Sequence, residues 1–341
     1  MADDSSTGQS STGQSSPGQS SPGQSSTVSV VPDGVLAYGM QLPVQALSVR
    51  VSMPWEQEAT VDDMVRVAQA ADAAGFLYVA VCHHVALPHE PAEMMSTQWF
   101  DPIATLGYLA GHTRRTRLMT NVFIAAYQPP LTVAKAFATL DRLSNGRMIV
   151  GVGAGHVEGE FDALGVSFSE RGKATDAALA VLSDALTNEW TTTASGDEVG
   201  QRPRPVQQPH PPIWIGGSGK PALRRVATMA DGWIPQATAL DQLPDDITTI
   251  LRERDKVRPG AVPEIGYHLV AHVGEPSWDL PKGVMHGSPD RIAEFANTRL
   301  GAIGVSHLQV RLFARDANEH CDQIAAFGAE VGPNLVRTPL S

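Results

Sequence analysis

The sequence predicts an α/β protein built as one closed (β/α)8 TIM barrel with eight parallel strands. Short apolar runs typical of buried strands alternate eight times with amphipathic helical patterns, and no two strand runs follow each other directly. Regular alternation indicates a parallel sheet with helical crossovers, and eight units within 341 residues is the count of a closed barrel. The alternative is an open doubly wound sheet, but that fold calls for fewer units and a glycine-rich turn after the first strand, where this chain has Gln41-Leu42-Pro43.

The first half of the barrel is delimited by clear helix start signals. Four apolar strand runs are expected at residues 35–42, 76–81, 116–125 and 147–153. Thr60 is followed by an acidic residue three positions on, Asp101 precedes a proline, and Pro129-Pro130 opens a further helix; each pattern is typical of a helix N-terminus. Apolar stripes at helical spacing then predict helices over residues 60–75, 101–112, 131–143 and 169–186.

The second half repeats the pattern. Strands are expected at residues 213–215, 232–235, 265–273 and 305–313, and helices at 221–230, 247–257, 288–296 and 317–331. Pro221 and Ser288-Pro289 mark two of the helix starts. The stretch Thr191–Gln208 is polar and contains prolines, so we expect a surface excursion there.

Residues 1–30 form a separate segment of low complexity. Ser-Ser-Thr-Gly-Gln occurs twice and Ser-Ser-Pro-Gly-Gln twice between Ser5 and Gln24. Such a composition cannot bury enough apolar surface to offset the entropy cost of ordering, so we expect a disordered tail rich in Ser, Gly and Gln. It lacks the basic start and apolar block of a secretory signal. Residues 31–341 are expected to form a single domain.

Charge, hydropathy and cysteine content limit the function classes. The formal charge is −11, 42% of residues are hydrophobic and 18% are charged, as in a globular chain. Without a run of Lys and Arg, we expect no nucleic-acid partner, and no apolar run is long enough to span a membrane. Cys82 and Cys321 lie far apart and lack metal-ligand spacing, so we expect two buried thiols, no metal, and a cytoplasmic protein.

The fourth strand ends in a glycine-rich run at the end of the barrel that carries function. Barrel enzymes place their functional groups at the carboxyl ends of the strands, and the run Arg147–His156 holds Gly151, Gly153 and Gly155. Glycine has no Cβ, so we expect these residues to let a planar ligand approach the backbone closely. The alternative is a tight turn without a ligand, because Gly-x-Gly alone is a weak signal.

A second glycine-rich run follows the fifth strand. Gly216-Gly217-Ser218-Gly219-Lys220 leads directly into a helix. Backbone N–H groups at a helix start, a serine hydroxyl and a lysine together form an anion site, so we expect a phosphate-bearing ligand here. The alternative is an ordinary strand-to-helix loop capped by the serine.

His84 and His156 are the candidate acid–base residues. Each follows a strand, and histidine titrates near neutral pH, so either could exchange a proton with a bound molecule; the alternative for each is a hydrogen-bonding role. His83 points to the other side of its strand from His84, so only one of this pair is expected to face the site. Three tryptophans could wall a substrate pocket, the alternative being plain packing: Trp55, Trp99 and Trp233.

Several motifs resemble the bacterial luciferase-like monooxygenase superfamily. The resemblance starts from two consecutive motifs, Ala136–Arg147 and Val150–Gly155. Further motifs are similar to its branch of coenzyme F-420-dependent oxidoreductases: Glu160–Val166, Glu170–Gly172, Pro211–Gly217 and Ala230–Trp233. The match as a whole covers roughly Val35 to Gly332, and the motifs together are more specific for the superfamily than for the cofactor.

The resemblance implies an oxidoreductase that transfers a hydride between the deazaflavin coenzyme F-420 and a small organic substrate, at a CH-OH, C=C or related group. A reduced-FMN-dependent monooxygenase and a non-catalytic flavin-binding protein are the alternatives, and a homodimer is a further implication. His84 matches the family's catalytic histidine, and a cis peptide is implied between Asn121 and Val122. The implied cofactor-binding residues are Met40, Asn121, Val122, Gly153, Ala154, Gly155, Gly216, Gly217, Ser218, Gly219 and Trp233.

His156 departs from the pattern of the family. Sugar-phosphate dehydrogenases of this superfamily carry a glutamate there, and many relatives of the branch carry a tryptophan. A glutamate general base is therefore expected to be absent from this position, which argues against transferring that activity. The residue before the catalytic histidine is often acidic in the family, whereas this chain has His83.

Overall fold

Eight parallel strands close into a barrel in the computed structural model, which describes residues 27–49 and 52–340. Neighbours follow chain order, and β1 pairs with both β2 and β12, which closes the sheet and confirms the predicted barrel. The barrel strands are β1 (Ala37–Gln41), β2 (Tyr78–Val81), β3 (Arg117–Thr120), β5 (Met148–Gly153), β8 (Ile213–Gly216), β9 (Gly232–Ile234), β10 (Glu264–Val273) and β12 (His307–Leu312).

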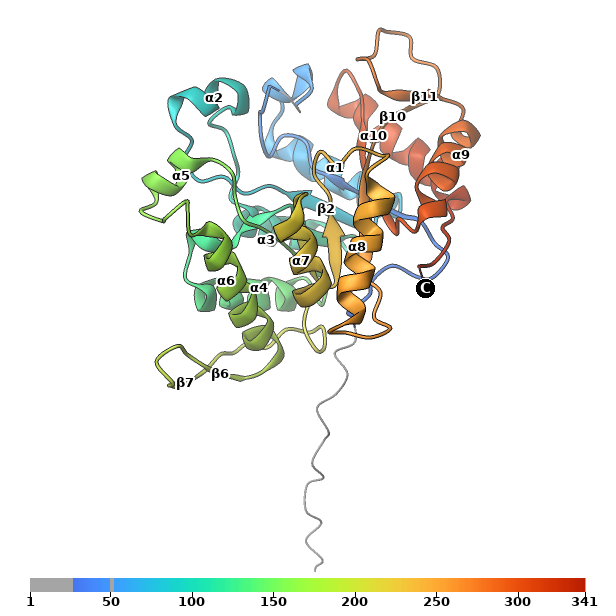
Figure 1. Ribbon diagram of the computed structural model, residues 1–341. Coiled ribbons are helices and arrows are strands. Elements are labelled where there is room, and N and C mark those ends of the chain that lie inside the picture. The colour runs from blue at the N-terminus through green and yellow to red at the C-terminus, as the bar shows by residue number, and fades with distance from the viewer. Residues whose placement is uncertain (1–26, 50–51, 341) are drawn as a thin grey trace, which may run out of the picture.

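Helices surround the sheet, and those predicted from periodicity are confirmed (Figure 1). Three predicted N-caps accept a backbone N–H with their side chains: Thr60 from Asp63, Asp101 from Ala104 and Ser288 from Arg291. The helices are α1 (Val61–Ala73), α3 (Pro102–His112), α4 (Pro130–Leu143), α6 (Arg171–Thr187), α7 (Lys220–Met229), α8 (Leu243–Asp255), α9 (Pro289–Arg299) and α10 (Ala317–Ala326), which continues as a π turn over Phe327–Val331.

Shorter elements at the two ends of the barrel were not predicted. They are too short to show a period, so only tertiary contacts define them. At the carboxyl end of the strands lie α2 (His89–Met95), α5 (Glu158–Ala163) and β11 (Met285–Gly287), and at the opposite end the hairpin of β6 (Trp190–Thr192) and β7 (Glu198–Gly200) projects from the predicted surface excursion (Figure 1). The expected third strand is split into β3 and a two-residue β4 (Phe123–Ile124).

Side chains fill the amino-terminal half of the barrel interior. Trp214 stacks on His307 with ring centroids 4.3 Å apart, and Tyr78 meets both rings edge-on. These residues lie in or against an interior cluster that also holds Ala80, Met119, Ile149 and Ile234, separate from the larger core between sheet and helices. The interior is therefore closed below, and space for a ligand is left at the carboxyl ends of the strands.

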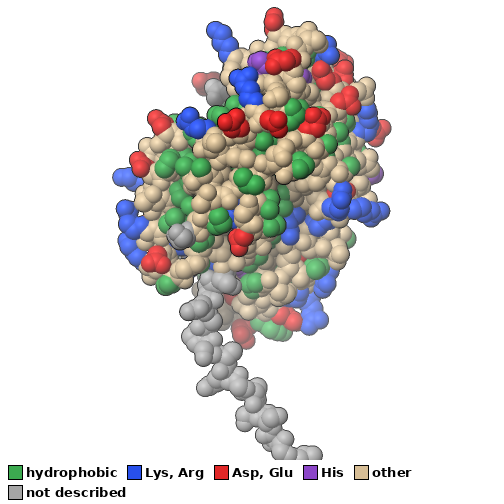
Figure 2. Space-filling view, turned by 90° about the vertical axis from the view of Figure 1, so that its right-hand side faces the viewer, with side chains coloured by type: hydrophobic (Ala, Val, Ile, Leu, Met, Phe, Trp, Pro, Cys, Tyr) green, Lys and Arg blue, Asp and Glu red, His purple; other side chains and the backbone are tan. Residues whose placement is uncertain are grey.

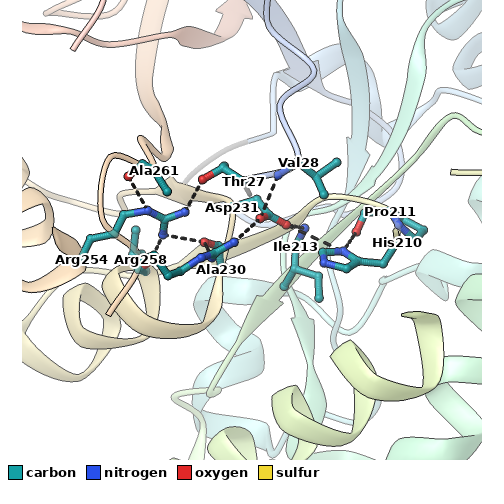
Figure 3. A network of polar contacts seen from close by, with 11 residues as sticks. Thr27, Val28, His210, Pro211, Ile213, Ala230, Asp231, Arg254, Arg258 and Ala261 are labelled. Carbon is teal, nitrogen blue, oxygen red and sulfur yellow. Dashed lines mark hydrogen bonds and ion pairs between the residues drawn. The ribbon is translucent and has the colours of Figure 1, made fainter. Parts of the chain in front are cut away.

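The segment Thr27–Val31 lies across the amino-terminal face of the barrel and is bound there by two buried acids. The Val28 N–H donates to Asp231 Oδ1 at 3.1 Å, and Asp231 Oδ2 accepts the Ile213 N–H at 3.0 Å (Figure 3). Glu264 Oε1 accepts three donors from this segment, the Ser29 hydroxyl and the N–H groups of Val30 and Val31, at 2.7–2.8 Å. Residues 27–30, expected within the tail, thus contact the barrel, whereas residues 1–26 lie outside the described residues.

The surface and the cysteines add three observations. On the face drawn in Figure 2, acidic and basic side chains are interspersed. Within residues 27–49 and 52–340, no helix has the length and apolar character to cross a bilayer, and no group of three or more His, Cys, Asp or Glu is placed to hold a metal. Cys82 and Cys321 are unpaired, but each is partly rather than fully buried.

Truncation of the chain tests the role of the segment Thr27–Val31. Deleting residues 1–26 leaves every contact of the segment Thr27–Val31 in place and is the control for the longer deletion. Deleting residues 1–31 leaves the buried Glu264 carboxylate without its three donors, which should lower the free energy of unfolding by about 3 kcal/mol. Urea denaturation followed by circular dichroism measures the free energy of unfolding of both truncated proteins. Equal midpoints would contradict a stabilising role of the segment Thr27–Val31.

Candidate active site

The chain bulges inward at the end of β3, where the Asn121–Val122 peptide bond is cis, as the resemblance implies. Across the bulge, Thr120 takes over the pairing with β5: its hydroxyl donates to the Gly151 carbonyl at 2.8 Å and accepts the Gly151 N–H at 3.0 Å. The carbonyl oxygen of Thr120 would lie only 1.9 Å from a Cβ at Gly151. Glycine at this position is therefore required by the backbone of the neighbouring strand.

The glycines at the ends of β5 and β8 surround the side chain of Val122. A Cβ at Gly153 would lie 2.3 Å from one Val122 methyl carbon, and a Cβ at Gly216 would lie 2.4 Å from the other. The space above these glycines, which was expected to admit a planar ligand, is thus filled by the Val122 side chain of the bulge. Val122, which is partly buried, presents the resulting surface to the barrel mouth.

His84 is paired with a buried carboxylate that the sequence did not single out. Its Nδ1 lies 2.8 Å from Oε2 of Glu160, a fully buried residue on α5. Glu160 also accepts the Tyr127 hydroxyl at 2.9 Å and the N–H groups of Val85 and Ala86. Because a carboxylate only accepts, Nδ1 of His84 carries the hydrogen in this pair, and Nε2 is left free to exchange a proton.

Hydrogen bonds keep Glu160 ionised despite its burial. Burial by itself raises the pKa of this carboxyl, but the hydrogen bonds from His84, Val85 and Tyr127 outweigh it and bring the pKa below its ordinary value. The site thus holds a fixed negative charge beside His84. The only signal for it in the sequence is its place at the start of the motif Glu160–Val166.

Aromatic rings surround His84 on the side of the mouth. Its ring centroid lies 4.4 Å from Trp99 and 5.9 Å from His156, so the two candidate acid–base residues are brought together. His156 stands at the exposed rim, after Ala154 and Gly155, both partly buried. Gly155 has φ +78°, and a Cβ there would meet the Phe161 ring at 2.7 Å.

His83 faces away from His84, as predicted. It is buried, stacks on Phe123 at 4.3 Å, and accepts the Ile124 N–H with Nδ1 at 3.1 Å. Burial lowers the pKa of His83 to about 4, so the ring is neutral and can accept at neutral pH. His83 therefore supports the backbone of β4 just beyond the bulge.

Amide side chains form a polar floor under the mouth. Asn121 Nδ2 donates to Gln309 Oε1 at 3.0 Å, and Gln309 Nε2 lies 3.4 Å from Gln41 Oε1. The buried Oδ1 of Asn121 has no hydrogen-bond partner among the described residues. An unsatisfied buried acceptor costs free energy unless a ligand supplies a donor, so the floor fits a ring with polar edge groups. Met40, next to Gln41, packs in the larger core and also lines the hollow beside this floor.

The loop between β8 and α7 is held from below by Trp233. This residue is fully buried, and its indole N–H donates to the Gly217 carbonyl at 2.7 Å. The Ser218 hydroxyl donates to the Gln236 carbonyl at 2.6 Å, and therefore it is not free for an anion. Gly219 is the N-cap of α7 and offers no side-chain cap, but Pro221 has no N–H and the N–H groups of Ala222 and Leu223 donate to the Gly219 carbonyl at 3.0 and 3.1 Å. In this first turn of the helix, the backbone N–H of Lys220 and its exposed side chain remain available for an anion.

Comparison with known proteins identifies a family. The family described as luciferase-like monooxygenase matches residues 40–289. An uncharacterized protein of Mycobacterium tuberculosis is 35% identical over 150 residues, which are 41% of this chain and 51% of that protein. The F420-dependent hydroxymycolic acid dehydrogenase of the same species is 30% identical over 197 residues, 55% of this chain and 52% of that protein. The chain thus spans about half the length of these curated relatives.

Solved structures share the fold at low sequence identity. The oxygenating constituent of 3,6-diketocamphane monooxygenase from Pseudomonas putida, in complex with FMN, has a TM-score of 0.72 at 14% identity and covers 90% of this chain and 100% of its own. An F420-dependent secondary alcohol dehydrogenase has a TM-score of 0.65 at 18% identity and covers 88% of this chain and 99% of its own. At such identities the likeness extends to the barrel alone.

A double-mutant cycle tests the contact between Val122 and Gly216. Gly216→Ala should lower the free energy of unfolding by about 2–3 kcal/mol, because the new methyl overlaps the valine. Combining it with Val122→Ala should recover at least about 1 kcal/mol of that loss, since the valine methyl that it meets is gone. Urea denaturation of the four proteins gives the coupling.

Two further glycine variants serve as controls for this cycle. Gly107→Ala on α3 has nothing within 4 Å and should be neutral or stabilising. Gly151→Ala meets a backbone oxygen, so Val122→Ala should not rescue it. Strict additivity of Gly216→Ala and Val122→Ala would show that the two residues do not compete for space.

Acid should destabilise the fold through His83. The ordinary pKa is 6.5 and the folded value is about 4, so below pH 6.5 the unfolded chain binds a proton that the folded chain refuses. The stability present above pH 6.5 is therefore lost as pH falls through 4, by about 3 kcal/mol. His83→Gln, whose amide oxygen can still accept the Ile124 N–H, should flatten this dependence in urea titrations at several pH values.

His89→Gln on the exposed part of α2 is the matched control and should leave the pH dependence intact. Buried His307 and His320, whose pKa values burial lowers to about 3 and about 4, supply the acid sensitivity that remains in the His83 variant. An unchanged dependence in His83→Gln would mean that this ring is charged in the folded protein.

Proposed function

The chain belongs to the luciferase-like monooxygenase family, and from this membership we propose that it is an oxidoreductase that transfers a hydride between coenzyme F-420 and a small organic substrate. The observation that carries the proposal is the pair of His84 and Glu160 beside the Val122 bulge, at the carboxyl end of the barrel. A proton-exchanging group and a shaped apolar surface thus lie on one face, where barrel enzymes place their chemistry.

The residues at the mouth fit a deazaflavin. Val122 would support the ring, the Oδ1 of Asn121, unpartnered among the described residues, would accept from a polar edge group, and Lys220 at the start of α7 would hold a phosphate of the tail. When bound, the cofactor supplies or accepts the hydride, and the protein orients it and handles the proton. A relative of the family, the hydroxymycolic acid dehydrogenase, is named as F420-dependent, which favours this cofactor.

His84 is the proposed catalytic residue, and Glu160 is the residue that positions it. Glu160 holds the hydrogen on Nδ1, so Nε2 is the atom that takes a proton from a substrate hydroxyl or returns it. When Nε2 gains the proton, the ionised Glu160 stabilises the positive ring. His156, at 5.9 Å from His84, would flank the substrate.

A reduced-FMN-dependent monooxygenase is the second candidate. It is favoured by a relative named as the oxygenase component of a flavin-dependent trigonelline monooxygenase from Acinetobacter baylyi, 27% identical over 175 residues. Titration of the purified protein with F-420 and FMN side by side, each oxidised and reduced and followed by fluorescence and absorbance, separates the two. Binding of F-420 supports the proposal; binding of FMN alone with oxygen-dependent product formation decides for the second candidate, and binding of neither would overturn both.

Replacing His84 should separate binding from turnover. His84→Ala should leave the Kd for F-420 within about threefold but lower kcat by about 10²-fold or more, the usual contribution of a general acid–base group. Turnover is followed by the loss of F-420 absorbance with a panel of secondary alcohols. His89→Ala on α2 should behave as wild type, and wild-type kcat in His84→Ala would exclude His84 from catalysis and favour a binding protein without turnover.

A further inference from the structure

A hollow of about 240 Å³ opens beside the polar floor, between β1, β10 and β12 and under the loop that follows β1. Polar and charged side chains line part of it: Gln41, Glu56, His268, Gln309, Arg311 and His320. His268 is exposed although it lies in the middle of a barrel strand, because the hollow reaches down to it. The space is thus continuous with the upper interior of the barrel, next to the amides that border the proposed cofactor site.

Arg311 is the cation of this hollow. On β12 it lies two residues beyond Gln309, on the same face of the strand, and pairs in register with Val270, which also lines the hollow. Within the part of the chain that the structure describes, its guanidinium has no hydrogen bond or ion pair, and its ring contact is Phe313, whose centroid lies 4.9 Å away. The acceptors of this guanidinium must therefore come from whatever enters the hollow, either water or the acidic group of a ligand.

The neighbouring titratable groups do not satisfy Arg311. Glu56 is buried, and its two oxygens accept the N–H groups of Val44 and Met53 at 2.7–2.8 Å, so it holds the loop after β1. The charge of Glu56 attracts Arg311 through space, but the two side chains do not form an ion pair. Although the His268 ring faces the hollow, the surrounding barrel wall desolvates it and lowers its pKa. Burial, helped by the charge of Arg311, lowers the pKa of His320 to about 4, so both rings are neutral at pH 7.

We propose that this hollow is a carboxylate subsite and that the substrate carries a carboxylate which Arg311 binds. A guanidinium offers two parallel N–H groups that match a carboxylate, and the volume admits a small organic acid. The inference rests on the proposed function in one respect, namely that the molecule in the hollow is the substrate. It makes Arg311 a specificity-determining residue that reads the charged end of the substrate, while His84 acts at its reacting end.

Binding of simple acids tests the subsite without the reaction. Acetate and benzoate are the probes, and benzamide is the neutral analogue matched in shape to benzoate; affinities are measured by isothermal titration calorimetry on the full chain, with and without cofactor. We expect wild type to bind at least one acid, to bind benzamide about tenfold or more weakly than benzoate, and to lose acid binding by about ten- to hundredfold in Arg311→Met. Arg311→Lys should retain part of the affinity.

Control variants keep the test independent of folding and of cofactor. Arg315→Met, at an exposed ion pair with Glu319, should bind acids as wild type does, and thermal melts establish that each variant is folded.

Failure of wild type to bind either acid, equal binding of benzoate and benzamide, or unchanged acid binding in Arg311→Met would overturn the proposal. So would a loss of cofactor affinity in Arg311→Met with acid binding intact, since Arg311 would then serve the cofactor. Absence of cofactor binding in wild type would refute the proposed function and leave the acid titration as a separate result.

Discussion

The side chain of Val122 occupies space that β5 and β8 leave open by carrying glycine, and the upper half of the barrel depends on this contact. The bulge can turn inward because Gly151 admits the Thr120 carbonyl, while Gly153 and Gly216 admit the two methyl groups of the valine. The same turn directs the Asn121 amide to Gln309 in the floor. One packing constraint across three strands therefore sets both the apolar surface and the polar floor of the mouth.

Buried carboxylates hold loops at both ends of the barrel. Each accepts backbone N–H groups, which offset part of the cost of burying it: Glu56 and Glu160 at the carboxyl ends of the strands, Asp231 and Glu264 at the amino ends. At the lower end this arrangement closes the barrel with the segment Thr27–Val31. At the carboxyl ends of the strands, Glu160 also accepts a hydrogen bond from His84, so a residue that holds a loop is at the same time part of the candidate site. Arg311 is the opposite case, because no described residue offers its guanidinium a hydrogen-bonded acceptor.

Prediction from sequence succeeded where a signal is local or periodic. The alternation of strands and helices, the caps at Thr60 and Asp101, and the opposite orientation of His83 and His84 each follow from residues close together in the chain. The partners of the site did not follow, because His84 and Glu160 are 76 residues apart, and Asn121 and Gln309 are 188 apart. Arg311 stands at a strand end like several other residues, and its lack of a partner is visible only once its neighbours are placed.

The sequence by itself determined the barrel. Hydrophobic periodicity and turn residues specify each element, and eight alternating strands and helices are the units of a closed parallel barrel. It also placed the candidate histidines and both glycine-rich runs at the functional end. Only the tertiary structure decided what the glycines accommodate, which carboxylate accompanies His84, and which cation faces the hollow. Those answers depend on contacts between strands and loops distant in sequence, and distances of 2–3 Å between such residues are set by the closed packing of the whole barrel.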